Sequence, residues 1–239
     1  TINLSSITFH ETLMLSGFIF IGSVNFAHST FIQGLHCKAC LISGNISLKG
    51  SKCIGTCDFE LAYIAGCSVF DHAVFQSLAS YEKCIFTQYS SFLESRFNDA
   101  QFMSSLFIGR VDFSRARINR GDFRSTKFMN LVRYVGTEFI YELIFDDAIM
   151  FCDNGEYADY TGAIFGADVS FRRVIFKDSV LFRNSNFIGQ VFFSKSEFHG
   201  ISSFNGVQFG DGVSFNKVHF HKKIDASSVC FMGETTFND

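Results

Sequence analysis

Four cysteines near the start of the chain have a spacing that could do chemistry. Cys37-x2-Cys40 is followed by Cys53-x3-Cys57, and two such pairs imitate the four thiolate ligands of a structural zinc site. A zinc site forms only if all four side chains point toward one place. The direction of each side chain depends on the element that carries it, and a repeat in the surrounding sequence determines those elements.

Phenylalanine recurs at intervals of five and six residues. From Phe165 to Phe220 the two intervals alternate, and the residue two places before each Phe is small or β-branched. One helix face cannot hold such a set, because each residue turns a helix by about 100°, and a flat strand cannot keep both intervals on one side. The chain must therefore turn once per interval. This pattern predicts a solenoid of short sides, in which the Phe (the central position) and the residue two before it (the minus-two position) point inward.

The same interval can be laid over nearly all of the chain, and 30 of the 33 Phe residues then occupy a central position. Three segments also carry Ala at the minus-two position: Ala73-Val74-Phe75, Ala100-Gln101-Phe102 and Ala163-Ile164-Phe165. With these residues the chain resembles a pentapeptide-repeat protein, in a Phe-centred variant with alternating five- and six-residue units. The resemblance covers residues 2–239. The family's preference for Asp or Asn before the central residue is weak here.

The resemblance implies an all-β fold, a right-handed quadrilateral parallel β-helix of about eleven coils with four units each. A repeat that runs nearly end to end predicts a single domain over residues 1–239. The repeat breaks near residues 151–157, where we expect a bulge or short loop. Because no capping segment is evident at either end, we expect a fragment or processed piece of a longer chain, with end-to-end association as the alternative.

The places of the cysteines in the repeat argue against a zinc site. Cys37 and Cys53 are at central positions, whereas Cys40, Cys57 and Cys84 are at minus-two positions, so we expect these five to be reduced, metal-free core residues. The three other cysteines are expected outside the core: Cys67, Cys152 and Cys230. Cysteines used in this way favour a reducing compartment, so we expect a cytoplasmic location, with a secreted effector as the alternative.

The seven histidines lie one or two residues from central positions and should point to solvent. His219 and His221, on either side of Phe220, could hold a metal ion together, but isolated surface histidines are more common, so we expect no metal and no cofactor. A polysaccharide-lyase-like β-helix enzyme is a further alternative. Such enzymes need a cleft with clustered Asp, Lys or Arg. Short regular units leave no long loops that could form the walls of such a cleft. We therefore expect no catalytic residues.

Charge is unevenly distributed between Arg96 and Asp159. Seven acids and no Lys or Arg occur in 138–159, after a segment rich in basic residues. Ion pairs between adjacent coils, such as Arg117 with Glu138, would explain this pattern; an anion-binding surface for partner recognition is the other interpretation. The basic belt consists of Arg96, Arg110, Arg115, Arg117, Arg120, Arg124, Lys127 and Arg133.

One predicted side of the solenoid is apolar on its outer surface. On the side centred on Phe20 and Phe107, the residues next to the central positions are aliphatic or aromatic over five coils, whereas the preceding side is polar. This apolar strip, the candidate partner surface, consists of Ile19, Ile21, Leu41, Tyr63, Ile85, Leu106 and Ile108. Strand propensity alone would also select such residues. As a contiguous strip, however, they indicate a contact surface.

Three classes of function remain. The first is a rigid scaffold that binds a protein partner or a second copy through the apolar side or the coil ends. The second is the DNA mimicry that the resemblance implies for relatives that protect a type II topoisomerase (gyrase); a formal net charge of −3 with a basic belt argues against it. The third is a polysaccharide-lyase-like β-helix enzyme, which the short regular units disfavour. No apolar window is long enough for a membrane span, and no specific nucleic-acid binding is expected.

Overall fold

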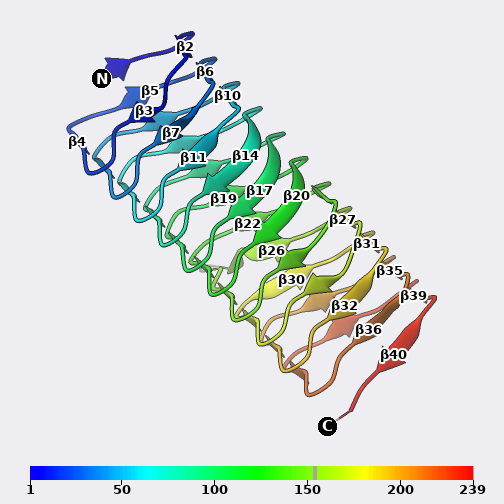
Figure 1. Ribbon diagram of the computed structural model, residues 1–239. Helices are drawn as coiled ribbons and strands as arrows, with labels where there is room; N and C mark the ends of the chain where they lie inside the picture. Colours follow the sequence, from blue (N-terminus) through cyan, green and yellow to red (C-terminus); the bar gives the residue numbers. More distant parts are fainter. Residues whose placement is uncertain (153–154, 239) are drawn as a thin grey trace.

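The computed structural model is an elongated rod of stacked coils, with the two termini at opposite ends (Figure 1). The structure describes residues 1–152 and 155–238. These residues form 40 short strands and no α-helix. Accordingly, in the described part of the chain there is no helix long and apolar enough to cross a membrane. The all-β parallel solenoid of about eleven coils is confirmed; its handedness and the shape of its cross-section stay predictions.

The strands stack in four parallel columns, because each strand pairs with the equivalent strand of the coil before it, of the coil after it, or of both. The β1 column contains β1 (Ile2–Asn3), β5 (Val24–Asn25), β9 (Ile46–Ser47), β13 (Ser68–Val69), β16 (Ser90–Ser91), β19 (Val111–Asp112), β22 (Val132–Arg133), β26 (Tyr157–Asp159), β30 (Ser179–Leu181), β34 (Ser202–Ser203) and β38 (Ile224–Asp225). The β4 column contains β4 (Ile19–Phe20), β8 (Leu41–Ile42), β12 (Tyr63–Ile64), β15 (Ile85–Phe86), β18 (Leu106–Phe107), β21 (Lys127–Phe128), β25 (Ile149–Met150), β29 (Ile175–Phe176), β33 (Glu197–Phe198) and β37 (His219–Phe220).

Two further columns are joined into one sheet by three long strands that run through both: β14 (Val74–Ser80), β17 (Arg96–Gln101) and β20 (Arg117–Asp122). The rest of the β2 column is β2 (Thr8–Phe9), β6 (Thr30–Phe31), β10 (Lys52–Cys53), β23 (Glu138–Phe139), β27 (Ile164–Phe165), β31 (Asn186–Phe187), β35 (Gln208–Phe209) and β39 (Cys230–Phe231). The rest of the β3 column is β3 (Leu13–Met14), β7 (Gly34–His36), β11 (Thr56–Asp58), β24 (Leu143–Ile144), β28 (Val169–Ser170), β32 (Gln190–Phe192), β36 (Gly212–Ser214) and β40 (Glu234–Thr236).

The pairing register shows that the coils differ slightly in length. Val74 pairs with Arg96, and Arg96 pairs with Arg117, so the second of these coils is one residue shorter than the first. The repeat predicts this difference, because a coil in which two five-residue intervals follow each other is one residue shorter than a coil in which five- and six-residue intervals alternate. Between β25 and β26 the coil is longer than the others, as the pairing of Ala158 with Val132 of the preceding coil shows. Compared with the coil from Val74 to Arg96, four residues are added here, within the segment where the repeat breaks; of that segment, residues 153–154 lie outside the described residues.

The interior is filled by ladders of aromatic rings. Phe92 stacks on Phe113 with ring centroids 4.5 Å apart, and Phe113 stacks on Tyr134 at 5.1 Å. Rings that follow the strands of the β1 and β3 columns, two sides apart along the chain, meet edge to face, as Phe113 does with Phe123 at 5.7 Å. Central positions from Phe20 to Phe215 are buried, as the repeat predicts. Both stacked and edge-to-face pairs are favourable arrangements of ring quadrupoles.

Tight turns connect the columns, and 16 non-glycine residues of the described part of the chain have a positive φ in these turns. Ala39 has φ 54° and Lys83 has φ 54°, whereas the equivalent place in another coil is Gly17, with φ 75°. Left-handed backbone is strained for any residue with a Cβ. The stacking of the coils on both sides must therefore hold these turns in place.

One cysteine is not where the repeat predicts it. Cys152 was expected outside the core, but only 1% of it is exposed, and it packs with the core residues. Burial raises the pKa of its thiol to about 12. The physical reason is the four-residue insertion that follows, which lets the chain turn inward where the regular interval would have placed an outer residue.

Candidate partner surface

The apolar strip lies on the β4 column, in register over five coils. Ile19 pairs with Leu41, Leu41 with Tyr63, Tyr63 with Ile85, and Ile85 with Leu106. In each of these strands the second residue points inward, so the first must point outward. The sequence therefore placed these five residues correctly relative to one another.

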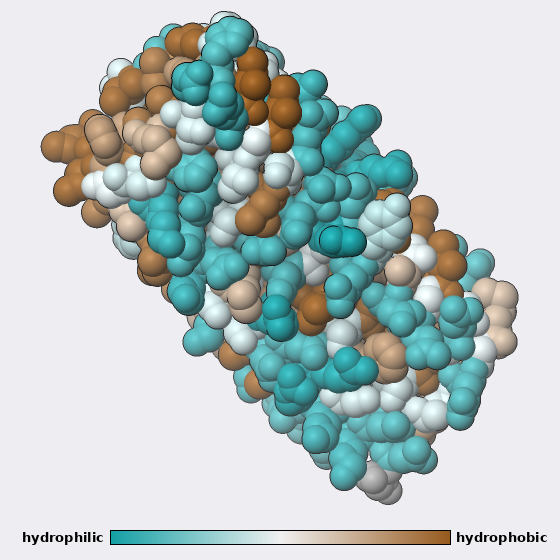
Figure 2. All heavy atoms as spheres, viewed as in Figure 1, coloured by the Kyte–Doolittle hydropathy of each residue, from teal (hydrophilic) through white to brown (hydrophobic). Residues whose placement is uncertain are grey.

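The exposure of the strip falls from the N-terminal coil toward the middle of the rod. Ile19 is 69% exposed and Ile21 is 93% exposed, and Leu41, Tyr63 and Ile108 are also exposed. The two remaining members, Ile85 and Leu106, are half-buried. Ile85 pairs with Tyr63 and Leu106, whereas Leu106 pairs with Ile85 and Lys127. Figure 2 shows apolar atoms gathered at the end of the rod where β4 lies, while most of the rest of that view is hydrophilic.

The neighbouring column is polar at the equivalent places from the second coil onward. On β7, β11, β14 and β17 the aligned residues are His36, Asp58, the buried Ser80 and Gln101. On β3 the aligned residue is the exposed Met14. Charged pairs continue past the strands, for example Lys38 Nζ with Glu60 Oε2 at 2.5 Å. The strip therefore has a polar edge on the side of the β3 column, as contact surfaces commonly do.

All eight residues of the basic belt are exposed, and the structure shows ion pairs for four of them. Arg115 meets Glu94 at 2.7 Å, Arg124 meets Asp122 at 2.5 Å, Arg110 meets Glu156 at 2.5 Å, and Arg117 meets Glu138 at 3.5 Å. The Arg117–Glu138 pair joins adjacent coils, as the sequence interpretation expects. Acidic neighbours thus offset half of the belt.

A shallow groove runs along the β2 column, over β14, β17 and β20. Its lining includes His72, Gln76, Glu94, Arg96, Asn98, Arg115, Arg117, Asn119 and Glu138. Glu94 binds both Arg115 and His72 Nδ1, the latter at 3.2 Å. Because the charges of the lining largely pair with one another, the groove does not present a site of one sign.

The cysteines at central and minus-two positions are buried, as predicted: Cys37, Cys40, Cys53, Cys57 and Cys84. Two of their thiols donate to backbone carbonyls of the preceding coil: Cys40 Sγ to Leu15 O at 2.8 Å, and Cys84 Sγ to Phe59 O at 2.7 Å. Burial raises the pKa of the Cys84 thiol well above its ordinary value. Cys67 is half-buried and Cys230 is exposed, in agreement with their places outside the core.

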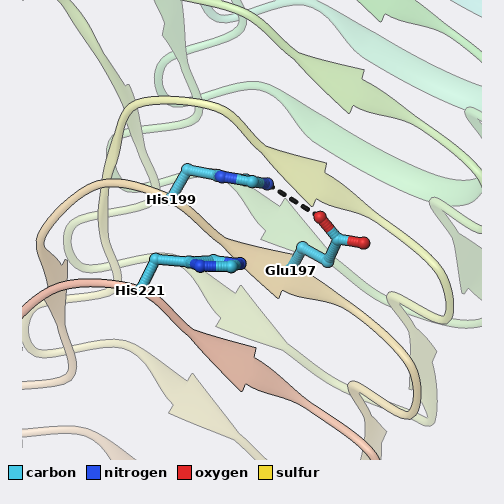
Figure 3. A group of neighbouring side chains, drawn as sticks. All are labelled: Glu197, His199 and His221. Carbon is cyan, nitrogen blue, oxygen red and sulfur yellow. Dashed lines mark hydrogen bonds and ion pairs between the residues drawn. The ribbon is translucent and has the colours of Figure 1, made fainter.

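Three side chains on the β4 column, which the sequence interpretation did not group, form a cluster (Figure 3). Glu197 and His199 come from one coil and His221 from the next. Their potential ligand atoms all lie within 4.8 Å of one another. The alternative of a His219–His221 pair shares only His221 with this cluster and did not include Glu197 or His199. The missed signal is the recurrence of Glu197-x-His199 as His219-x-His221 one coil later.

The cluster has a defined internal geometry. His199 Nε2 lies 2.8 Å from Glu197 Oε2, and the rings of His199 and His221 stack with centroids 4.3 Å apart and planes 10° from parallel. The contact with His199 lowers the pKa of the Glu197 carboxyl. A carboxylate and two imidazoles are thus presented together on the outer surface.

Comparison with known proteins agrees with the repeat. Residues 171–219 match the family model for pentapeptide repeats (9 copies). No curated protein sequence matches the chain.

Two solved structures are similar to this chain. One is HetL, a pentapeptide repeat protein involved in heterocyst differentiation regulation from the cyanobacterium Nostoc sp. strain PCC 7120; it is 10% identical, with 98% of this chain and 86% of that chain covered and a TM-score of 0.21. The other is QnrB1, a plasmid-mediated fluoroquinolone resistance protein; it is 13% identical, with 96% and 91% covered and a TM-score of 0.20. At such scores these likenesses carry no weight for function. Residues 171–219 thus match pentapeptide repeats, and the same parallel coil arrangement continues in the coils before them.

Proposed function

We propose that the chain is a non-catalytic, rigid scaffold that binds a protein partner through the apolar strip. The observation that carries this proposal is the in-register row of outward apolar residues on β4, β8, β12, β15 and β18. Five coils extend the row over roughly 20–25 Å. Contiguous exposed apolar surface of this kind marks contact sites on soluble proteins.

The partner proposed for the strip is a second copy of this chain. The strip follows a straight column, so a two-fold axis perpendicular to the rod can bring the same strip of a second rod against it, as in most homodimers. Side chains such as Leu41 and Ile85 are complementary to themselves, because aliphatic contacts need no charge pairing. The polar β3 column beside the strip would form the rim of this interface.

A non-catalytic role agrees with the places of the reactive groups. The buried thiols donate to main-chain carbonyls or fill the core, and the charges in the groove pair with one another. Neither group offers a nucleophile beside a free base. The DNA-mimic alternative needs a broadly acidic surface, whereas the basic belt is exposed; a gyrase supercoiling assay with the purified chain tests it, and protection of gyrase would support mimicry.

Replacing both Leu41 and Ile85 by Lys tests the proposed interface. The wild-type chain should self-associate in sedimentation velocity, and the double variant should sediment as a monomer, because two buried ammonium groups facing their symmetry copies repel and lose hydration. Circular dichroism of the double variant should keep its β-signature, since both changes lie on the outer surface.

The matched control is His36→Lys with Gln101→Lys. Both residues are half-buried outer residues of the β3 column, and the change adds the same number of lysines to the polar side. This control should associate like the wild type. A monomeric wild-type chain, or equal loss of association in both double variants, would contradict self-association through the apolar strip.

A further inference from the structure

The Glu197, His199 and His221 cluster lies on the same β4 column as the apolar strip, but toward the other end of the rod. Its backbone is held in register: His199 N donates to Phe176 O at 2.8 Å, and His221 N donates to Phe198 O at 2.9 Å. Glu197 pairs with His219 across β33 and β37. The coil spacing therefore determines the distance between the two histidines, and only side-chain rotations remain free.

An ordinary ion pair does not account for the cluster. His72 and Glu94 form a similar surface pair at 3.2 Å, but no second histidine stacks there among the described residues. Here the imidazoles of His199 and His221 lie parallel, 4.3 Å apart, beside the Glu197 carboxylate. Imidazole nitrogens and carboxylate oxygens are common metal ligands.

We propose that Glu197, His199 and His221 form a binding site for a divalent transition-metal ion, with Zn²⁺ as the best match. Two imidazole nitrogens and one carboxylate oxygen are a common three-residue set for zinc, with a water at the fourth position. Ligand atoms about 2.0–2.2 Å from one ion lie about 3.3 Å from each other. The three donor atoms already lie within 4.8 Å of one another. To bind one ion, the two rings, which now stack, would have to tilt out of their parallel arrangement so that a nitrogen of each points at the ion.

This site joins two adjacent coils, because Glu197 and His199 come from one coil and His221 from the next. A bound ion would therefore cross-link the solenoid along its axis. Since the three-residue site forms only when the two coils stack, the ion should raise the thermal unfolding temperature, by an amount that zinc binding to the thiols exposed on unfolding reduces. This effect does not depend on the apolar strip or on a partner.

Zinc titration by calorimetry tests the site, with the chain free of any histidine tag and carrying Cys230→Ser. That change removes the exposed thiol, which would otherwise compete for zinc. One equivalent of Zn²⁺ should bind. His199→Ala and His221→Ala should each weaken binding at least about tenfold, because even loss of a residue that only supports a ligand has that effect. Glu197→Gln should weaken it as well.

His72→Ala is the matched control, because it removes a histidine from a surface Glu–His pair without a third donor. It should bind Zn²⁺ like the parent. In the parent, Co²⁺ should give an absorption spectrum of nitrogen and oxygen ligands without a thiolate charge-transfer band, and Zn²⁺ should raise the unfolding temperature. Binding that is equal in the parent, His199→Ala and His221→Ala would overturn the proposal, as would the absence of one-to-one binding in the parent.

Discussion

At the scale of single residues, the minus-two positions have a second role besides packing. Several of the Ser, Thr and Cys side chains at these positions donate to a carbonyl of the preceding coil. Ser51 and Ser95 donate to a carbonyl of their own coil instead, and the buried hydroxyls of Ser68 and Ser202 have no partner among the described residues. Ser185 Oγ reaches Tyr160 O at 2.8 Å, and Thr126 Oγ1 reaches Phe102 O at 2.8 Å. A buried hydroxyl is stable only when it is hydrogen-bonded. These contacts explain why small polar residues alternate with Ala and Val in an otherwise apolar core.

Tyr81 and Tyr134, at central positions, also have buried hydroxyls without a partner among the described residues. The ring of Tyr81 stacks between Phe59 and Phe102, with centroids at 5.5 and 4.8 Å. Burial raises the pKa of this phenol well above its ordinary value. The hydroxyl thus loses its hydration without compensation.

Tyr81→Phe should therefore stabilise the chain by about 1 kcal/mol, since it removes an unsatisfied buried polar group and keeps the ring. The midpoint of urea unfolding measures this change. Tyr160→Phe is the control, because the Tyr160 hydroxyl contacts Met150 Sδ at 3.4 Å, so its gain should be smaller. A clear loss of stability in Tyr81→Phe would show that the hydroxyl has a partner.

At the scale of elements, the corners between columns limit how closely coils can stack. A Cβ added to Gly66 would lie 2.4 Å from the backbone carbonyl carbon of Gly44, one coil earlier. Here close approach of two backbones, and not a special φ, requires glycine. One coil later the equivalent place is Gln88, as the pairing of Ser68 with Ser90 shows.

Gly66→Ala should destabilise the chain by about 1–3 kcal/mol, because the new methyl group forces adjacent coils apart. Chemical denaturation followed by circular dichroism measures this change. Gln88→Ala changes the equivalent corner of the next coil without adding atoms, and it should leave stability nearly unchanged. Equal stability of Gly66→Ala and the wild type would mean that the corner can relax without cost.

At the scale of the whole molecule, the rod is a one-dimensional array in which each coil packs only on its neighbours. Phe193 shows this arrangement: it is fully buried and stacks on Phe171 at 5.1 Å and on Phe215 at 5.4 Å. A defect in one coil should therefore affect adjacent coils first and distant coils little.

Phe193→Ala should cost about 3–5 kcal/mol of local stability, because it leaves a cavity in the ladder. Hydrogen exchange measured by mass spectrometry should speed up in β28, β32 and β36, while β6 and β10 keep their wild-type rates. Ser194→Ala, next to it but half-buried, should change exchange little. An equal increase of exchange along the entire rod would contradict the array and indicate one cooperative unit.

The sequence by itself determined the fold, because an interval of five and six residues is compatible with neither a helix nor a flat strand. Phe75, Phe97 and the other central positions had to turn inward once the chain turned at every interval. The same register predicted that Cys37 and Cys53 are buried and that Arg117 meets Glu138. It also aligned Leu41 with Tyr63 on the apolar strip.

Only the tertiary structure decided the features that depend on side-chain rotamers and on departures from the interval. The repeat places His199 and His221 one coil apart, but it does not say that their rings stack or that Glu197 turns toward them. It does not predict that Cys152 turns inward before the four-residue insertion. A periodic pattern determines which face a residue occupies, whereas contacts within a face depend on rotamers and insertions, which have no period.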